Sequence, residues 1–174
     1  MQMKKPIFLV GMMGAGKSSL GKALAQGFNL PFLDSDEWIE AKSQKSIKEL
    51  FEKDGESCFR LWEKQFLDVL NGECLIVATG GGLPCFLGNM DRLKELGTVL
   101  YLKLTVEQLV KRVSNDGERP LLTNVPDIQS KINDLLELRA EIYEQAHFIL
   151  NGDGSIPELI EETERLMVTN KGLF

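Results

Sequence analysis

The chain has 174 residues, of which 43% are hydrophobic and 26% are charged, as is ordinary for a soluble globular protein. This length favours one domain over residues 1–174, with a hydrophobic core that needs no disulfides. The net charge of −6 argues against a basic nucleic-acid-binding surface, and no apolar stretch approaches the roughly 20 residues that cross a bilayer. We therefore expect small-molecule partners, with neither nucleic acid nor a membrane among them.

The N-terminal segment predicts a cytoplasmic protein, and the cysteines predict no disulfide framework. The apolar run before Gly11 has only about five residues, too few for the apolar region of a secretory signal, and it reads better as a buried strand. Cys58, Cys74 and Cys85 are odd in number and form no CxxC pair. They fit neither a disulfide framework nor a zinc site, so we expect reduced, mostly buried thiols.

Apolar runs typical of strands alternate along the chain with segments of helical periodicity. We predict strands at residues 6–11, 30–36, 74–82, 98–104 and 147–151. We predict helices at residues 17–28, 46–56, 57–72, 90–96, 105–113, 128–146 and 156–167. Continuous apolar strands between helices indicate a parallel sheet covered on both faces, so the expected fold class is α/β, a three-layer α/β/α arrangement with five strands. Ligands of such sheets bind beyond the carboxyl ends of the strands.

A glycine-rich segment between the first predicted strand and the first predicted helix fits the phosphate-loop pattern GxxxxGK[ST]. Its backbone N–H groups can surround phosphate oxygens, and the helix that follows adds the positive end of its dipole. The lysine of such a loop reaches the β and γ phosphates, and the serine hydroxyl binds Mg²⁺. The sequence thus predicts a nucleotide site at Gly11, Met12, Met13, Gly14, Ala15, Gly16, Lys17, Ser18 and Ser19.

Six segments extend this motif into a family resemblance: GMMGAGKSS, LDSD, GESCFRLWE, TGGG, RPLL and LRAEIY. They occur in the order seen in shikimate kinases, and the resemblance covers nearly the whole chain. That family phosphorylates the 3-hydroxyl of shikimate with ATP and Mg²⁺ in aromatic amino-acid biosynthesis. The resemblance implies a P-loop, nucleoside monophosphate kinase-like fold and a monomer, with acceptor-binding helices at about 35–71 and a lid at about 114–126.

Asp34 and Asp36 lie two positions apart at the end of a predicted strand. On a strand they would point to the same side, with Ser35 pointing away. A kinase needs one carboxylate for Mg²⁺ and another that orients the acceptor hydroxyl and takes its proton. The residues alone leave open which acid has which role, and also the alternative that they cap the next helix. The resemblance assigns Asp34 to the metal and Asp36 to the acceptor hydroxyls.

Two arginines in different predicted helices are candidates for an anionic acceptor. Planar guanidinium groups suit bidentate binding of a carboxylate, and Glu63, three positions after Arg60, could hold that side chain in place. The resemblance implies that Arg60 and Arg139 bind the carboxylate of shikimate, with Glu63 in support.

The glycines Gly80, Gly81 and Gly82 directly follow a predicted strand. A glycine run there exposes backbone N–H groups and lets a ligand approach closely, although an irregular turn is the plain alternative. The resemblance implies that this run contacts shikimate.

The segment 114–126 is long, polar and rich in glycine and proline, which is typical of an active-site cover. Arg119 stands in its middle. Closure would exclude water and bring a cation to the charge on the transferring oxygens, so Lys17, Asp36 and Arg119 form the expected catalytic set. An exposed loop with an incidental arginine is the alternative.

The nucleoside contact is the least defined part of the expected site. Arg112 could stack on adenine through its flat face. Pro157 matches the proline that the family has before the last helix. The basic residues often found just before that proline are absent, and Asp153 and Gly154 stand there, so the base preference stays open.

Two further functions remain open at this point. The chain could be another phosphate-loop kinase, acting on gluconate or a nucleoside monophosphate, or a nucleotide-binding regulator without catalysis. Asp36, Arg60, the glycine run and Arg139 favour a small polyhydroxy carboxylate over both.

Overall fold

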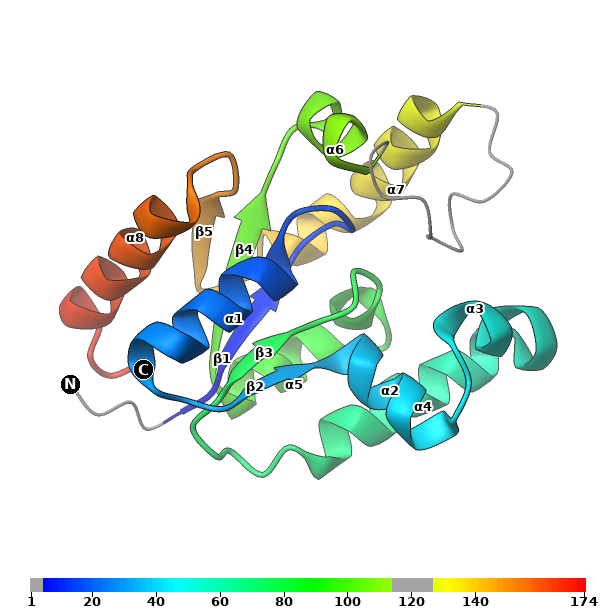
Figure 1. Ribbon diagram of the computed structural model, residues 1–174, viewed down its shortest axis with the longest axis horizontal. Coiled ribbons are helices and arrows are strands. Elements are labelled where there is room, and N and C mark those ends of the chain that lie inside the picture. The colour runs from blue at the N-terminus through cyan, green and yellow to red at the C-terminus, as the bar shows by residue number, and fades with distance from the viewer. Residues whose placement is uncertain (1–4, 114–126) are drawn as a thin grey trace.

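The structure is a computed structural model that describes residues 5–113 and 127–174. The expected lid, including Arg119, falls outside these ranges. Within them, five parallel strands form one sheet in the order β2-β3-β1-β4-β5. Helices α1 and α8 lie together on one face and α5 and α7 lie on the other, which confirms the predicted three-layer α/β/α class (Figure 1).

The predicted element order is largely confirmed. The strands are β1 (Ile7–Val10), β2 (Phe32–Asp34), β3 (Ile76–Ala78), β4 (Thr98–Lys103) and β5 (Phe148–Asn151). The helices are α1 (Lys17–Phe28), α2 (Ser35–Ser43), α3 (Ile47–Glu49), α4 (Gly55–Val69), α5 (Asn89–Leu96), α6 (Val106–Val113), α7 (Ile128–Tyr143) and α8 (Ile156–Thr169). A π-helical turn, η1 (Leu50–Asp54), joins α3 to α4, and a 3₁₀ turn, η2 (Leu83–Cys85), follows the glycine run.

The central strand β1 is fully buried because it has a neighbour on each side and helices over both faces. Ile7 pairs with Ile76 of β3 and with Thr98 of β4. All four β1 side chains are 0% exposed, which accounts for their continuous apolar run. The phosphate-loop segment leaves this strand at its carboxyl end, where ligands of parallel sheets bind.

Helix α2 was not predicted, and its first residues lie where the sequence predicted the end of a strand over 30–36. The strand ends at Asp34, whose Oδ1 accepts hydrogen bonds from the backbone N–H of Asp36 at 2.9 Å and of Glu37 at 3.5 Å. These bonds cap α2, so the chain becomes helical at Ser35. Asp36 therefore lies in the first turn of a helix, and the expected strand geometry for the two acids is wrong.

The helix predicted over 46–56 is also wrong in form. The α-helical part covers only Ile47–Glu49, and the chain continues through the π-helical turn η1. Gly55 adopts φ 81°, a left-handed conformation that favours glycine, and α4 begins there.

The helices α2 to α4 carry a small hydrophobic cluster of their own, formed by Ile39, Leu50 and Phe59. Figure 1 shows these helices beside β2, at the edge of the sheet away from β5. The cluster holds them as one unit facing the carboxyl ends of the strands. The resemblance predicts that this unit binds the acceptor, and that role stays a prediction.

The histidine and the three cysteines lie outside the residues predicted to form the site. Nδ1 of His147 accepts a hydrogen bond from the backbone N–H of Val99 at 3.0 Å. The thiols of Cys58, Cys74 and Cys85 are free and partly buried. Among the helices in the described ranges, none has both the length and the apolar character needed to cross a membrane.

Candidate active site

A cleft of about 840 Å³ opens beyond the carboxyl ends of β1, β2 and β3. The phosphate loop and the start of α1 form one side, and helices α2 to α4 form the other. Among the predicted site residues, those that line it are Met13, Gly14, Gly16, Lys17, Ser18, Ser19, Asp34, Asp36, Arg60, Glu63, Gly80, Gly81, Gly82, Arg112 and Arg139.

Four other predicted residues do not line this cleft. The side chains of Met12 and Ala15, two residues of the loop itself, are buried in the core, and Gly11 lies at the start of the loop. Pro157 is an exposed residue in the first turn of α8. The structure therefore does not bring Pro157 to the cleft, and its nucleotide contact stays a prediction.

The phosphate loop depends on glycine at positions with positive φ. Gly11 has φ 140°, and a β-carbon there would lie 2.8 Å from the carbonyl oxygen of Leu102. Gly14 has φ 78°, and a β-carbon there would lie 2.6 Å from Cγ2 of Val113. Gly16 precedes α1 in a left-handed conformation, and no side chain caps that helix. The first N–H groups of α1 are thus left to bind an anion at the cleft.

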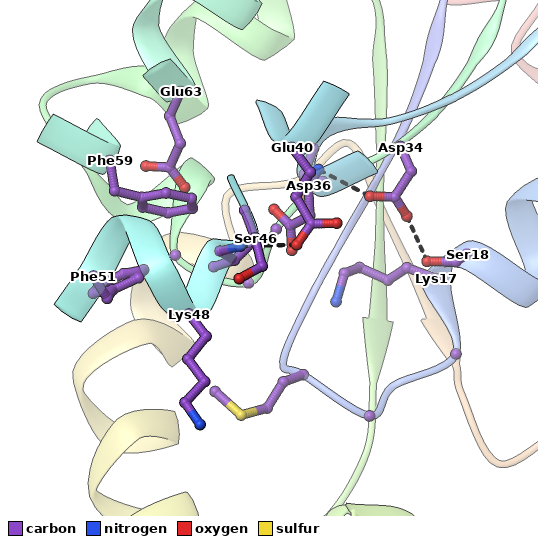
Figure 2. Close-up of a pocket in the computed structure, with 18 of the residues that line it drawn as sticks. Lys17, Ser18, Asp34, Asp36, Glu40, Ser46, Lys48, Phe51, Phe59 and Glu63 are labelled. Carbon is purple, nitrogen blue, oxygen red and sulfur yellow. Dashed lines mark hydrogen bonds between the residues drawn. The ribbon is translucent and has the colours of Figure 1, made fainter. Parts of the chain in front are cut away.

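The amine of Lys17 lies inside the curve of this loop. Its Nζ donates hydrogen bonds to the carbonyl oxygens of Gly11 at 2.9 Å and of Met12 at 2.8 Å. The side chain is only 8% exposed. Figure 2 shows Lys17 near Ser18, Asp34 and Asp36, so its positive charge lies close to both carboxylates.

Ser18 and Asp34 bring two oxygen ligands together at the start of α1. The Ser18 hydroxyl donates a hydrogen bond of 2.6 Å to Oδ2 of Asp34 (Figure 2). Mg²⁺ prefers such oxygen donors and keeps most of its other sites for water and phosphate. The described residues contain no group of three or more His, Cys, Asp or Glu side chains that could hold a metal alone. The donor set therefore fits a Mg²⁺ ion that shares its coordination with a nucleotide.

Asp36 points into the cleft between the two halves of the site. Its Oδ1 accepts a hydrogen bond from Ser35 Oγ at 3.3 Å, and Ser35 Oγ in turn accepts one from the backbone N–H of Gly80 at 2.7 Å. Burial, and next the nearby Asp34 carboxylate, raise the pKa of Asp36 to about 6, although Lys17 opposes this shift. A carboxylate with such a pKa can accept a proton near neutral pH.

The guanidinium of Arg60 is held on several sides. It forms ion pairs with Glu63 Oε2 and Glu56 Oε1, each at 2.7 Å. It also lies over the rings of Phe59 and Phe86, at 5.6 Å and 5.4 Å from their centroids. These contacts fix the orientation of a group that would meet a planar carboxylate.

The glycine run leaves room for side chains of the site. A β-carbon on Gly80 would stand 2.5 Å from Oδ1 of Asp36, and one on Gly82 would stand 2.7 Å from an NH1 of Arg60. The backbone of Gly81 packs beside Arg139, whose NH1 would be 3.5 Å from a β-carbon there. At Gly80 and Gly82, only a residue without a β-carbon lets Asp36 and Arg60 approach this turn so closely.

Glu63 is the most deeply buried acid of the cleft, with 1% of its surface exposed. Its Oε1 has no hydrogen-bond partner among the described residues. Burial raises the pKa of Glu63 to about 7, even though Arg60 opposes this shift. The side chain can therefore exchange a proton in the physiological range.

Arg112 of α6 joins the phosphate loop to the segment after β5. It donates hydrogen bonds to the carbonyl oxygens of Ala15 at 2.9 Å and of Gly152 at 2.8 Å. These bonds place the guanidinium at the nucleotide side of the cleft. Stacking on adenine stays a prediction.

Several lining residues were not predicted from the sequence: Glu40, Ser46, Ile47, Lys48, Phe51, Phe59 and Thr79. The signal for three of them was present, because Ser46 and Glu49 form a capping box at the start of α3. That box, together with a hydrogen bond of 2.8 Å from the Ile47 N–H to Glu40 Oε1, turns α3 towards the cleft (Figure 2). The rings of Phe51 and Phe59 pack against each other at the wall of the cleft, with centroids 4.7 Å apart and planes tilted by 40°.

The fold and the cleft together define a P-loop kinase that phosphorylates a small molecule, because a phosphate loop faces a separate basic pocket across one carboxylate. Comparison with known proteins gives the family. The shikimate kinase family model matches residues 13–167. The chain therefore belongs to the shikimate kinase family.

Individual relatives agree with this assignment. The chain is 43% identical to the shikimate kinase of a Sulfurihydrogenibium species, over 91% of this chain and 94% of that protein. It is similar to a solved shikimate kinase from Acinetobacter baumannii in complex with shikimate, with a TM-score of 0.89, 38% identity, and coverage of 96% of this chain and 94% of the other. A gluconokinase from Sinorhizobium meliloti has a TM-score of 0.59 at 17% identity, with coverage of 93% and 90%, a likeness of fold alone.

Proposed function

We propose that this chain transfers the γ-phosphoryl group of ATP to the 3-hydroxyl of shikimate. The observation that carries the proposal is the placement of Arg60 and Arg139 at the glycine run, which lies beside the phosphate loop in the same cleft. Shikimate is a ring with three hydroxyls and one carboxylate. Two fixed guanidinium groups suit its carboxylate, and Asp36 suits a hydroxyl on its other side.

On the nucleotide side, the loop amides and Lys17 bind the β and γ phosphates. The Lys17 amine, which hydrogen-bonds the loop carbonyls in this structure, exchanges those acceptors for phosphate oxygens. Ser18 and Asp34 hold Mg²⁺ together with the phosphates. When bound, Mg²⁺ supplies positive charge to the phosphate oxygens.

On the acceptor side, the arginines orient the ring so that its 3-hydroxyl meets Asp36. The Asp36 carboxylate accepts a hydrogen bond from that hydroxyl and takes its proton as the bond to phosphorus forms. Lys17 stabilises charge on the transferring oxygens. We assign Arg119, outside the described residues, the same task from the lid.

A coupled assay of ADP release tests the proposal against its alternatives. The purified chain is given ATP and Mg²⁺ with shikimate, gluconate or a nucleoside monophosphate. We expect rapid ADP release with shikimate and only background release with the other acceptors. Turnover of gluconate or a nucleotide without turnover of shikimate would contradict the proposal, and tight ATP binding without any turnover would favour a regulator.

We further propose that the chain acts as a monomer in the cytoplasm, with small molecules as its partners. Among the described residues, the exposed large apolar side chains are spread over several elements, such as Leu61 on α4, Leu138 on α7 and Val168 on α8. The acidic net charge supports the absence of nucleic acid from its partners. Light scattering of the purified chain should give a mass near 19.5 kDa.

A further inference from the structure

We propose that Tyr143 is a positioning residue of the acceptor site, which acts through its hydroxyl on the glycine run. The proposal rests on the proposed function, because it takes the arginines at that run as the acceptor-binding groups. Tyr143 does not line the cleft and is 0% exposed, so it contacts no substrate. Its effect on the reaction must pass through the residues that it holds.

The hydroxyl of Tyr143 forms a short hydrogen bond with the glycine run. It donates to the carbonyl oxygen of Gly81 at 2.6 Å. The two residues are 62 positions apart, so the bond ties the end of α7 to the turn after β3. Burial raises the pKa of Tyr143 above its usual range, so the hydroxyl stays protonated and remains a donor throughout the working pH range.

This bond fixes the direction of a backbone donor. In a planar trans peptide, the C=O of one residue and the N–H of the next point in opposite directions. The C=O of Gly81 points to the buried phenol, so the N–H of Gly82 points away from it. Gly81 and Gly82 both line the cleft and Gly82 lies beside Arg60, so the bond fixes a peptide that forms part of the acceptor-side wall.

The same hydroxyl also meets the phosphate loop and Arg139. Tyr143 Oη lies 3.8 Å from Sδ of Met12, and NH1 of Arg139 lies 4.0 Å from the same sulfur. Arg139 precedes Tyr143 by one helical turn, so both side chains leave the same face of α7. Tyr143 thus stands where the phosphate loop, the glycine run and α7 meet.

The substitution Tyr143→Phe removes the hydroxyl and keeps the ring. The ring packs on Tyr101, with centroids 5.1 Å apart, and that contact remains. Without its donor, the peptide between Gly81 and Gly82 loses its bond to α7, and the surface beside both arginines is held less firmly. We expect the KM for shikimate to rise about tenfold, while the KM for ATP and the kcat change less than threefold.

Tyr101→Phe is the matched control, since it removes a buried phenolic hydroxyl from the partner ring, on β4. We expect wild-type KM values for it. An unchanged KM for shikimate in Tyr143→Phe, an equal rise in the KM for ATP, or the same effect in Tyr101→Phe would each overturn the proposal. So would failure of Tyr143→Phe to fold, because the hydroxyl would then serve stability. Wild-type activity is measured first, and its absence with shikimate counts against the proposed function and not against Tyr143.

Discussion

The hydroxyl of Ser18 donates a hydrogen bond of 2.6 Å to Oδ2 of Asp34, across 16 positions of sequence. The other oxygen of the same carboxylate caps α2 by accepting from the Asp36 N–H at 2.9 Å. One aspartate therefore joins the start of α1 to the start of α2. The cap and the proposed metal ligand, which the sequence offered as alternatives, occupy the two oxygens of one side chain.

Asp34→Asn should separate these two roles. Asparagine retains an oxygen for the cap but loses the charge that attracts Mg²⁺. We expect the Mg²⁺ concentration for half-maximal activity to rise at least about tenfold, with a small change in the unfolding temperature. Asp34→Ala should also lose the cap, at a cost of about 1 kcal/mol in the free energy of unfolding. A wild-type Mg²⁺ titration for Asp34→Asn would exclude Asp34 as a ligand.

Asp36→Asn should lower the rate and spare nucleotide binding. Loss of a general base typically reduces kcat by about 10²–10⁴-fold. The wild-type kcat/KM for shikimate should rise with pH through a pKa of about 6, because Asp36 must be ionised to take the proton. That step should vanish from the residual activity of the variant. A wild-type pH profile that is flat between pH 5 and about pH 8 would contradict this role.

The same substitution should stabilise the chain at alkaline pH. Between the ordinary value of 3.8 and the raised value of about 6, the folded chain holds a proton on Asp36 that the unfolded chain has released. Raising the pH through this window therefore lowers the free energy of unfolding. We expect Asp36→Asn to gain up to about 3 kcal/mol at about pH 8, and nothing at about pH 3.5, by denaturant unfolding. Asp68→Asn, an exposed acid of α4, is the control and should show no such gain.

Arg139→Ala should raise the KM for shikimate with little effect on the KM for ATP. Loss of a hydrogen bond to a charged group costs about 1.5–3 kcal/mol, which corresponds to about a 10–100-fold change. Arg60→Lys should also weaken shikimate binding, because an ammonium cannot reproduce the paired contacts to Glu56 and Glu63. Arg92→Ala, on the surface of α5, should behave as wild type. Parallel losses for both substrates would remove the arginines from the acceptor site.

Gly82→Ala should displace Arg60 without unfolding the chain. The added β-carbon would lie 2.7 Å from NH1 of Arg60, the end of a flexible side chain that can move. We expect the KM for shikimate to rise about five- to tenfold at nearly constant unfolding temperature. Gly27→Ala in α1 meets nothing within 4 Å and should leave kinetics unchanged. A wild-type KM for Gly82→Ala would show that Arg60 does not need this position.

The phosphate loop and helix α1 could be predicted from the sequence. The phosphate loop is a local motif, and the helix predicted over residues 17–28 is the helix observed, Lys17–Phe28. The order of strands and helices also followed from local apolar patterns, which depend on neighbours in the chain.

The segment from α2 to α4 was harder to predict from the sequence, because its structure depends on contacts between distant segments. The acids at 34 and 36 take different elements once Asp34 caps α2. The cleft wall of α3 and η1, including Lys48 and Phe51, was not predicted, because short turns carry little periodicity.

By itself, the sequence determined the phosphate loop and the family through short contiguous motifs. It determined the α/β class through the apolar pattern of each segment. All three signals depend on residues close together in the chain. Only the tertiary structure decided that Gly80 and Gly82 admit Asp36 and Arg60, and that the phenol of Tyr143 reaches Gly81. These contacts join residues far apart in the chain. The first two contacts form because Gly80 and Gly82 have no β-carbon, and the third forms because the Tyr143 hydroxyl is a buried donor. Neither feature has an effect until the sheet and its helices have packed.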